Sequence, residues 1–425
     1  MQKILHKLSY KLNKSEKNII VLAALGGMLE FYDFTIYGLF SVYFAKQYFP
    51  FNNESLSIIT SFAIFIIGYI ARPVGGIIFS HMGDSIGRKL VLIITMLIMG
   101  LASLVIGLIP TYDKIGMIAP IVLLISRLLQ GLAIGGEIPS MIVYVTESMP
   151  QKRGYAIGGI IAGSDAGLLV GLGINYIIVH IFSTQQLFDF GWRIPFLLGG
   201  LLCFVSYFIR KNLHETKAFS NLHQKAKIPL FEVLNKYPLQ LLGSIGITSV
   251  MAGFIMLGII FMPTFITQLA KINNPAFSLY LLIATTITVI SAYLTGLIVN
   301  KHNPKRFMLF ALFAAFIFII VAFKLIQDNN SLLLGLCIIT ILQGMFATLS
   351  PLLISYIFPP QVRLTGVALS YNLSHTIFGG MSPIIVTWLI SKYQITYLAP
   401  IAYLMCVIVI SLISLRYIHR KITIT

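Results

Sequence analysis

The sequence is poor in charged residues, and acidic residues are the scarcest of them. Only 10% of the 425 residues are charged, and 13 Asp and Glu stand against 30 Lys and Arg. Long polar stretches are also missing, whereas apolar residues make up 57% of the chain and the mean hydropathy is +0.91. These values lie outside the range of ordinary soluble domains and predict a polytopic membrane protein.

Cysteine is scarce as well. Cys203, Cys337 and Cys406 all lie in apolar runs, far apart and without the spacing of metal ligands. No phosphate-binding glycine loop and no cluster of His, Cys and Asp is visible, so the sequence predicts neither an enzyme nor a bound cofactor or metal. The net charge of +17 is scattered over predicted loops, which favours membrane topology over nucleic-acid binding as its explanation.

A membrane-spanning helix needs about 20 predominantly apolar residues, because no backbone polar group can stay unpaired in the hydrocarbon core. The sequence predicts twelve such spans, at residues 18–44, 56–80, 90–109, 119–147, 155–181, 193–211, 239–268, 277–299, 307–325, 331–357, 366–391 and 396–415. The fold class is therefore an all-α membrane protein with twelve transmembrane helices.

The basic residues predict the orientation of these spans. With twelve spans both termini share one side, and 22 of the 30 Lys and Arg fall at the termini and in the even-numbered gaps between spans. Cytoplasmic loops carry an excess of Lys and Arg, so both termini are predicted to be cytoplasmic. The first 14 residues, with Leu5, Leu8 and Leu12 on one helical face, fit either a helix on an anionic leaflet or a disordered basic tail.

The two halves of the chain resemble each other. "TESMPQKRGYAIGG" after span four and "ISYIFPPQVRLTGVALS" after span ten share a Pro, a basic residue and a Gly, and this register aligns Glu147 with Tyr356. The longest polar stretch separates six spans from six. The predicted domains are a basic segment at 1–17, a six-helix bundle at 18–211, a central cytoplasmic loop at 212–238, a second six-helix bundle at 239–415 and a tail at 416–425.

Several motifs carry a resemblance to a known family. The loop "GDSIGRK" (83–89) resembles the cytoplasmic loop signature of the major facilitator superfamily. Together with "LEFYDF", "GYIARPVGG", "RLLQGLAIGGE", "GWRIPFLLGG" and "LHETKAF", it resembles the metabolite:proton symporter family, which contains proline/betaine, citrate, 2-oxoglutarate and shikimate transporters. The resemblance implies two six-helix bundles around a central cavity. The chain departs from the family pattern at Tyr356, where an acid is usual, and at Asn300, near which an Asp is usual.

The loop motif predicts a conformational latch. Its glycines permit a tight turn, and Asp84 and Arg88 can pair with nearby charges or helix ends. Arg72 precedes Pro73 near the predicted cytoplasmic end of span two, so it is grouped with the latch rather than with the solute site. The predicted latch residues are Gly83, Asp84, Gly87, Arg88, Lys89 and Arg72.

Four acids lie well inside predicted spans, away from the span ends, where an ionised side chain is costly and marks a cavity, a partner or a proton relay. They are Asp33, Glu30, Glu137 and Asp165. Glu30 and Asp33 stand one helical turn apart and could titrate as a coupled pair, with Asp33 as the proton carrier; the alternative is a salt bridge with Arg127. Each of Glu137 and Asp165 is either a proton site or a structural acid.

Arg127 could hold a solute carboxylate through two hydrogen bonds, or it could pair with Glu30 or Asp33. His375 is either a packing residue or a proton relay. The predicted solute-binding residues are Arg127, Tyr32, Tyr37, Tyr371, Asn372 and His375.

The sequence thus predicts a monomeric carrier in the bacterial cytoplasmic membrane that imports a small polar metabolite with protons by alternating access. The predicted spans contain four mid-span acids and only two mid-span Arg, which favours a zwitterionic solute such as proline or a betaine. An organic acid is the second choice of solute. The expected partners are the solute and the lipid bilayer, and the coupling ion is the proton. Efflux and a membrane nutrient sensor that does not transport remain the alternatives.

Overall fold

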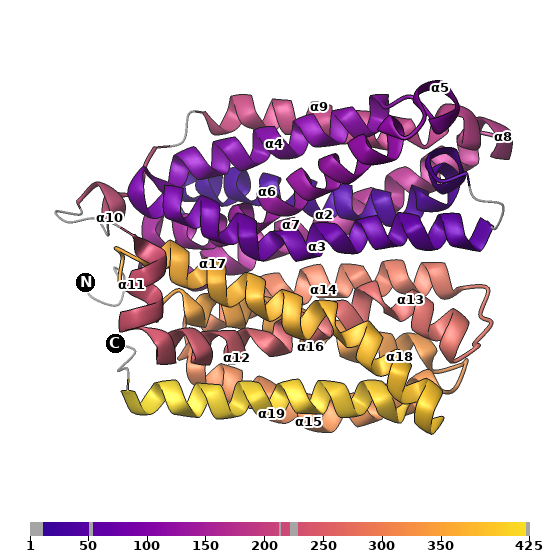
Figure 1. The fold of residues 1–425 in the computed structure, drawn as a ribbon. Coiled ribbons are helices and arrows are strands. Elements are labelled where there is room, and N and C mark those ends of the chain that lie inside the picture. Colours follow the sequence, from indigo (N-terminus) through magenta and orange to yellow (C-terminus); the bar gives the residue numbers. More distant parts are fainter. Residues whose placement is uncertain (1–11, 51–53, 212–213, 222–227, 422–425) are drawn as a thin grey trace.

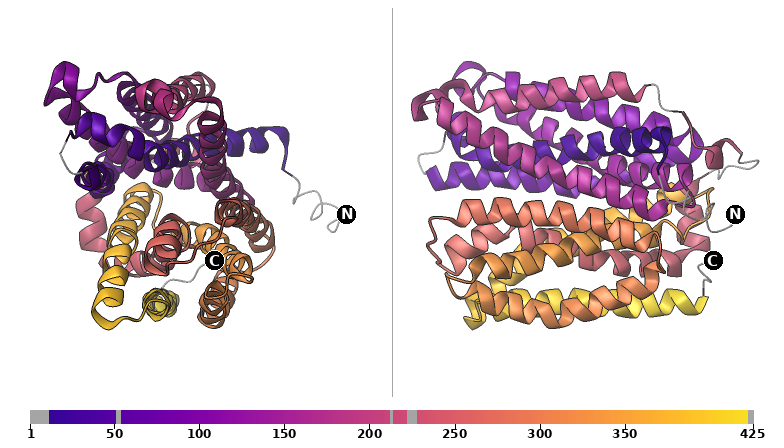
Figure 2. Two further views of the ribbon diagram at one scale, coloured as in Figure 1. Left: turned by 90° about the vertical axis from the view of Figure 1, so that its right-hand side faces the viewer. Right: turned by 180° about the vertical axis from the view of Figure 1, so that it is seen from behind.

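The computed structural model describes residues 12–50, 54–211, 214–221 and 228–421. Residues 1–11, which hold most of the predicted basic segment, lie outside this range. Two bundles of long helices lie one above the other in Figure 1, and the view along the helices in Figure 2 shows the helices of each bundle grouped together.

The N-terminal bundle contains six long helices, as predicted. They are α2 (Lys14–Tyr48), α3 (Glu54–Ser85), α4 (Arg88–Leu108), α6 (Ile118–Ser148), α7 (Arg153–Ile181) and α9 (Arg193–Arg210). The first of them begins with a capping box, in which Asn13 and Glu16 exchange side chain to backbone hydrogen bonds of 2.8 Å. Three short segments, α5 (Tyr112–Ile115), α8 (Thr184–Gln186) and the π-helical η1 (Leu187–Gly191), lie at one end of this bundle.

The C-terminal bundle repeats this arrangement with α12 (Pro238–Ile255), α14 (Phe277–Val299), α15 (Pro304–Ile326), α16 (Leu332–Ile354), α17 (Arg363–Ser374) and α19 (Leu398–Lys421). Two of these spans continue through π-helical turns. They are α12, followed by η2 (Met256–Ile260), α13 (Met262–Thr264) and η3 (Phe265–Leu269), and α17, followed by η4 (His375–Gly380) and α18 (Ser382–Tyr393). Such turns occur often at functional sites.

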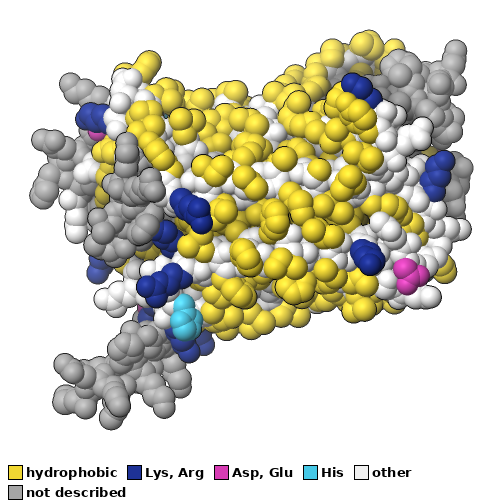
Figure 3. Space-filling view, turned by 90° about the horizontal axis from the view of Figure 1, so that it is seen from below, with side chains coloured by type: hydrophobic (Ala, Val, Ile, Leu, Met, Phe, Trp, Pro, Cys, Tyr) yellow, Lys and Arg dark blue, Asp and Glu magenta, His cyan; other side chains and the backbone are white. Residues whose placement is uncertain are grey.

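The helices have the length and composition of membrane spans. Within the described residues, ten are long and apolar enough to cross a bilayer, and Thr184–Gly191 with Arg193–Phe208 forms an eleventh, bent by 43°. The remaining predicted span, 56–80, corresponds to α3, a helix of 32 residues. Figure 3 shows apolar side chains over the middle of one face, with Lys and Arg toward its two ends. The protein is therefore a multi-pass membrane protein.

The two ends of the bundles differ. The first residue of α2 and the last of α19 lie at the same end, which we call the basic end; we call the other the far end. The described residues of the predicted loop 212–238 lie at the basic end and include two short helices, α10 (Lys217–Ser220) and α11 (Pro229–Lys236). Contacts of α11 with both α3 and α17 connect the two bundles there.

Candidate functional site

A small cavity lies between the bundles, about halfway along the helices. We call it the central cavity. It is lined by Glu30, Phe31, Phe34, Tyr69, Arg72, Ile255, Tyr371 and His375, so α2 and α3 supply one wall and the C-terminal bundle supplies the other. Its volume of about 20 Å³ holds about one water molecule. The bundles must therefore separate before a metabolite can enter.

Close helix packing positions one wall of this cavity. A Cβ atom added to Gly131 of α6 would lie 2.1 Å from the carbonyl oxygen of Gly68, and one added to Gly135 would lie 2.1 Å from that of Arg72. Small residues at this crossing let the α3 and α6 backbones touch. The glycines of "RLLQGLAIGGE" thus fix the height and direction of Arg72.

Arg72 lines the central cavity and does not lie beside the loop at 83–89, where the sequence placed it. Its side chain stands about 20 Å from the end of α3 at Ser85, given the rise of an α-helix. The predicted span ended at residue 80, which placed Arg72 too close to the loop. The guanidinium carbon lies 5.2 Å from the ring centre of Tyr69 and 5.8 Å from that of Tyr371. Within the described residues, Nε and Nη2 have no hydrogen-bond partner, so both are available to a ligand.

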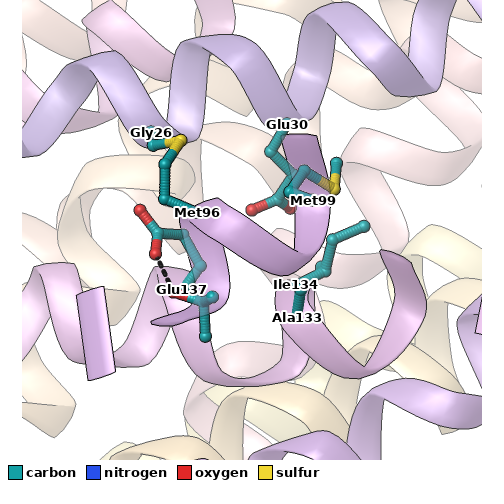
Figure 4. Close-up of a pocket in the computed structure, with 8 residues that line it drawn as sticks. Gly26, Glu30, Met96, Met99, Ala133, Ile134 and Glu137 are labelled. Carbon is teal, nitrogen blue, oxygen red and sulfur yellow. Dashed lines mark hydrogen bonds between the residues drawn. The ribbon is translucent and has the colours of Figure 1, made fainter. Parts of the chain in front are cut away.

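Glu30 faces the central cavity and a second cavity of about 10 Å³ inside the N-terminal bundle. The carboxyl groups of Glu30 and Glu137 both point into this second cavity in Figure 4. Glu30 is 5% exposed, and its Oε2 has no hydrogen-bond partner among the described residues. A buried, ionised carboxylate without a full set of hydrogen bonds is costly, so Glu30 is a candidate proton site.

Asp33 occupies a different environment from Glu30. Its Oδ2 lies 3.1 Å from Nη1 of Arg127, and Ser103 Oγ donates a 2.6 Å hydrogen bond to its Oδ1. Gln130 hydrogen-bonds both Arg127 and Ser103. The sequence left open whether Arg127 binds solute or pairs with an acid, and the structure places it in a buried ion pair with Asp33.

Two of the predicted solute-binding tyrosines support this N-terminal core instead of lining the central cavity. The ring centre of Tyr37 lies 3.4 Å from the Arg127 guanidinium carbon, and Tyr37 is fully buried. The hydroxyl group of Tyr32 donates a 2.7 Å hydrogen bond to the carbonyl of Pro195. Both rings therefore hold α2 against neighbouring helices.

Glu137 also has a basic partner. Its Oε1 lies 2.6 Å from Nη1 of Arg210, and Thr95 hydrogen-bonds its other oxygen. Arg210 donates in addition to the carbonyls of Leu22, Ala23 and Leu92. Arg210 is one of the 22 basic residues that predict the orientation, although it falls inside the predicted span 193–211; that position was the signal for this pair.

Asp165 is buried in α7, and its Oδ2 has no hydrogen-bond partner among the described residues. It lines neither the central cavity nor the cavity between Glu30 and Glu137.

The C-terminal wall of the central cavity comes from the start of the π-helical turn η4. His375 stacks on Tyr371 with ring centres 4.1 Å apart, and its Nδ1 lies 2.9 Å from the Tyr371 carbonyl. His375 Nε2 has no partner among the described residues. Asn372 points to the opposite bundle, where its Nδ2 donates a 2.8 Å hydrogen bond to the carbonyl of Gly135. The structure thus brings Tyr371 and His375 to the cavity and Asn372 to the interface beside it.

A cluster of charges joins the two bundles at the basic end. We call it the latch cluster: Asp84, Arg88, Glu147, Arg363 and Thr365. Arg88 lies 3.1 Å from Asp84 and 3.3 Å from Glu147, whose other oxygen lies 2.9 Å from Arg363 in the opposite bundle. Asp84 accepts hydrogen bonds of 3.3, 2.9 and 2.8 Å from the backbone of Leu364 and from the backbone and hydroxyl of Thr365. It therefore caps the first turn of α17 across the interface.

The remaining loop residues shape the turn that supports the latch cluster. Gly87 has φ 141°, a conformation that favours glycine, and a Cβ atom there would lie 2.3 Å from a carboxylate oxygen of Glu215. Lys89 contributes its backbone N–H, which donates a 3.1 Å hydrogen bond to Glu215. A Cβ atom on Gly83 would lie 2.1 Å from a methyl group of Leu364. The motif thus permits the two bundles to touch.

The second half of the chain has a weaker counterpart of this latch. Tyr356 aligns with Glu147 in the internal repeat, and its ring centre lies 4.3 Å from the guanidinium carbon of Arg153. A cation–π contact thus stands where the first half has a carboxylate between two guanidinium groups. The basic end is therefore closed asymmetrically.

Two six-helix bundles that meet at a polar cavity and close over it at one end define the fold of a secondary transporter. The family model described as Major Facilitator Superfamily matches residues 23–383. The Proline/betaine transporter of Escherichia coli K12 is 30% identical, with 94% of this chain and 82% of the relative covered. The Salmonella typhimurium LT2 protein of the same name is 29% identical over the same shares.

Solved structures agree on the fold. The proton:xylose symporter XylE, bound to 6-bromo-6-deoxy-D-glucose, superposes with a TM-score of 0.80 at 16% identity and 97% coverage of both chains. A D-xylose-proton symporter gives a TM-score of 0.66 at 18% identity, covering 93% of this chain and 96% of the other. The chain belongs to the Major Facilitator Superfamily, which confirms the family and the fold expected from the sequence.

Proposed function

We propose that this protein imports a small zwitterionic solute, such as proline or a betaine, together with protons across the bacterial cytoplasmic membrane. The observation that carries the proposal is the charge content of the central cavity, where one guanidinium group and one carboxyl group each keep an unpartnered polar atom. The names of the relatives in Escherichia coli and Salmonella support the same solute class.

Each end of a zwitterion has a complement in this cavity. Nε and Nη2 of Arg72 are free to bind a carboxylate in the two-pronged geometry that guanidinium groups favour. Tyr69 and Tyr371 already contact the Arg72 guanidinium group, and the ring of Phe34, which lines the same cavity, can contact an ammonium group. Glu30 supplies the proton site beside them. A dianion would have one guanidinium group for two carboxylates and would face Glu30 as well.

The solute role of Arg72 predicts a selective loss of binding. Arg72→Gln should weaken the affinity for proline or glycine betaine by about tenfold to a hundredfold, because a hydrogen bond to a charged group contributes about 1.5 to 3 kcal/mol. Isothermal titration of the purified protein measures the affinity. Arg306→Gln, at an exposed position of α15, is the matched control and should bind normally. Unchanged affinity in Arg72→Gln would exclude this site.

Transport direction is tested in proteoliposomes with an imposed pH gradient of either sign. Import with protons predicts that labelled solute accumulates in the more alkaline compartment. Efflux by proton antiport predicts accumulation in the more acidic one. A protein that binds the solute without moving it in either gradient would be a sensor.

The orientation follows from the Lys and Arg excess at the basic end, which we assign to the cytoplasm. In a variant without Cys203, Cys337 and Cys406, a cysteine at Asn330 should react with an impermeant thiol reagent added to intact cells, and one at Ser220 should not. Both positions are exposed, and they lie at opposite ends of the molecule. If only the cysteine at position 220 reacted, the basic end would face the outside of the cell.

A further inference from the structure

A cleft of about 640 Å³ lies at the far end of the N-terminal bundle, well away from the central cavity. It is bounded by the ends of α4 and α9, by α5 and by η1, near the α5 label in Figure 1. All of its walls belong to one bundle, so it is not part of the path that opens between the bundles. Its size is in the range of small-molecule sites. Its polar lining residues are Gln47, Thr111, Asp113, Lys114, Asp189 and Arg193.

The cleft holds two positive and two negative side chains. Within the described residues, no ion pair joins Asp113, Lys114, Asp189 or Arg193 to one another or to another charge. Asp189 instead accepts a 3.0 Å hydrogen bond from the uncharged side chain of Gln185, and all four charged groups line the open cleft.

Arg193 is held in place by the fold. Its Nη1 donates hydrogen bonds of 3.0 Å to the carbonyl of Gly107 and 2.6 Å to that of Ile109, and its guanidinium carbon lies 4.4 Å from the ring centre of Trp192. Across the cleft, Oε1 of Gln47 has no hydrogen-bond partner among the described residues. The cleft therefore offers a fixed cation and an unused acceptor.

This lining selects for a zwitterion. A purely anionic ligand would meet Asp113 and Asp189, and a purely cationic one would meet Lys114 and Arg193. A molecule with a phosphate and an ammonium group can satisfy both pairs. An ammonium group with N–H donors suits the carboxylates and Gln47 better than a quaternary ammonium group, which has none.

Apolar surface below the cleft points to a lipid as the source of this zwitterion. The lining includes Leu108 and Leu197, and the same two helices expose apolar side chains farther along the span. These are Leu101 and Val105 on α4, and Leu198, Leu201 and Val205 on α9. We propose that the cleft binds the headgroup of phosphatidylethanolamine in the leaflet at the far end, with the acyl chains along α4 and α9.

Native mass spectrometry of the full-length protein tests this proposal. The protein is titrated with phosphatidylethanolamine, phosphatidylcholine or phosphatidylglycerol of identical acyl chains. We expect the first phosphatidylethanolamine to bind about tenfold more tightly than either other lipid, which corresponds to one additional charge-assisted hydrogen bond. The double variant Asp113→Asn/Asp189→Asn should lose this preference. Asp328→Asn, which changes an exposed acid at the far end of the other bundle, should keep it.

Three outcomes would overturn the proposal. The first is equal affinity of the unaltered protein for all three lipids. The second is a phosphatidylethanolamine preference that survives in the double variant while its thermal unfolding midpoint is unchanged. The third is displacement of phosphatidylethanolamine by free glycine betaine or proline but not by glycerophosphoethanolamine, which would assign the cleft to a dissolved solute.

Discussion

Glu30→Gln is expected to abolish solute accumulation driven by a pH gradient and to leave exchange of solute between equal pools intact. A gradient of one pH unit stores about 1.4 kcal/mol per proton, enough for about tenfold accumulation. Without a proton site the accumulation ratio should fall to about one, whereas exchange needs no net proton movement. Counterflow and gradient-driven uptake in the same proteoliposomes measure the two activities.

The structure favours Glu30 over Asp33 as the proton carrier, in contrast to the sequence-based expectation. Glu30 faces the central cavity with an unpartnered oxygen, whereas Asp33 is bound to Arg127 and Ser103. A group that is already held in an ion pair must break it whenever it takes up a proton. Glu30 can be protonated without breaking an ion pair within the described part of the chain.

Asp33→Asn provides the contrasting variant. Removing one partner of a buried ion pair costs about 3 to 5 kcal/mol, so this change should lower the thermal stability of the folded protein. Restoring the charge balance with Asp33→Asn/Arg127→Gln should recover part of that stability. If Glu30→Gln still concentrated solute in a pH gradient while Asp33→Asn folded normally and did not, Asp33 would be the carrier.

Glu147→Gln is expected to open the basic end. Its carboxylate lies between Arg88 and Arg363 and is fully buried, so its neutral replacement leaves two guanidinium groups without their shared anion. A loss of about 3 to 5 kcal/mol from the closed state shifts the equilibrium between the two openings by at least about a hundredfold. Turnover should fall because the carrier then stays in the conformation that is open at the basic end. The affinity for solute should change little.

Hydrogen exchange of the first turn of α17 measures this opening directly. Exchange at residues 363–366 should accelerate at least about tenfold in Glu147→Gln, because these amides are covered by the other bundle only while the latch cluster is intact. Glu232→Gln is the control: it removes an acid at the same end, paired with Lys236 at 2.9 Å on the surface of α11. Unchanged exchange together with loss of solute binding would show that Glu147 supports the site rather than the latch.

Tyr356 makes the second half of the contact between the bundles weaker than the first half. A second carboxylate at this position would pair with Arg153 as Glu147 pairs with Arg363, and opening would then break two buried ion pairs. The cation–π contact that replaces it contributes about 0.5 to 2 kcal/mol. The second repeat, which has Tyr356 in place of an acid, thus forms the weaker half of the contact between the bundles at the basic end.

The sequence by itself determined the membrane class, the twelve spans and the likeness between the halves. These follow from local properties, because a bilayer requires about 20 apolar residues for each crossing whatever the other helices do. It also located the turn of the latch, since the φ of Gly87 and the closeness of Asp84 to Arg88 arise within seven residues.

Only the tertiary structure decided which acid meets which base. Asp33 finds Arg127 and Glu137 finds Arg210 across 94 and 73 positions of sequence, and Arg72 reaches the central cavity instead of the loop. Spacing along one helix fixes which side chains share a face, but not which neighbour that face meets. The height and rotation of each helix are set by contacts such as that between Gly131 and the Gly68 carbonyl, and these rotations separate the roles of Glu30 and Asp33.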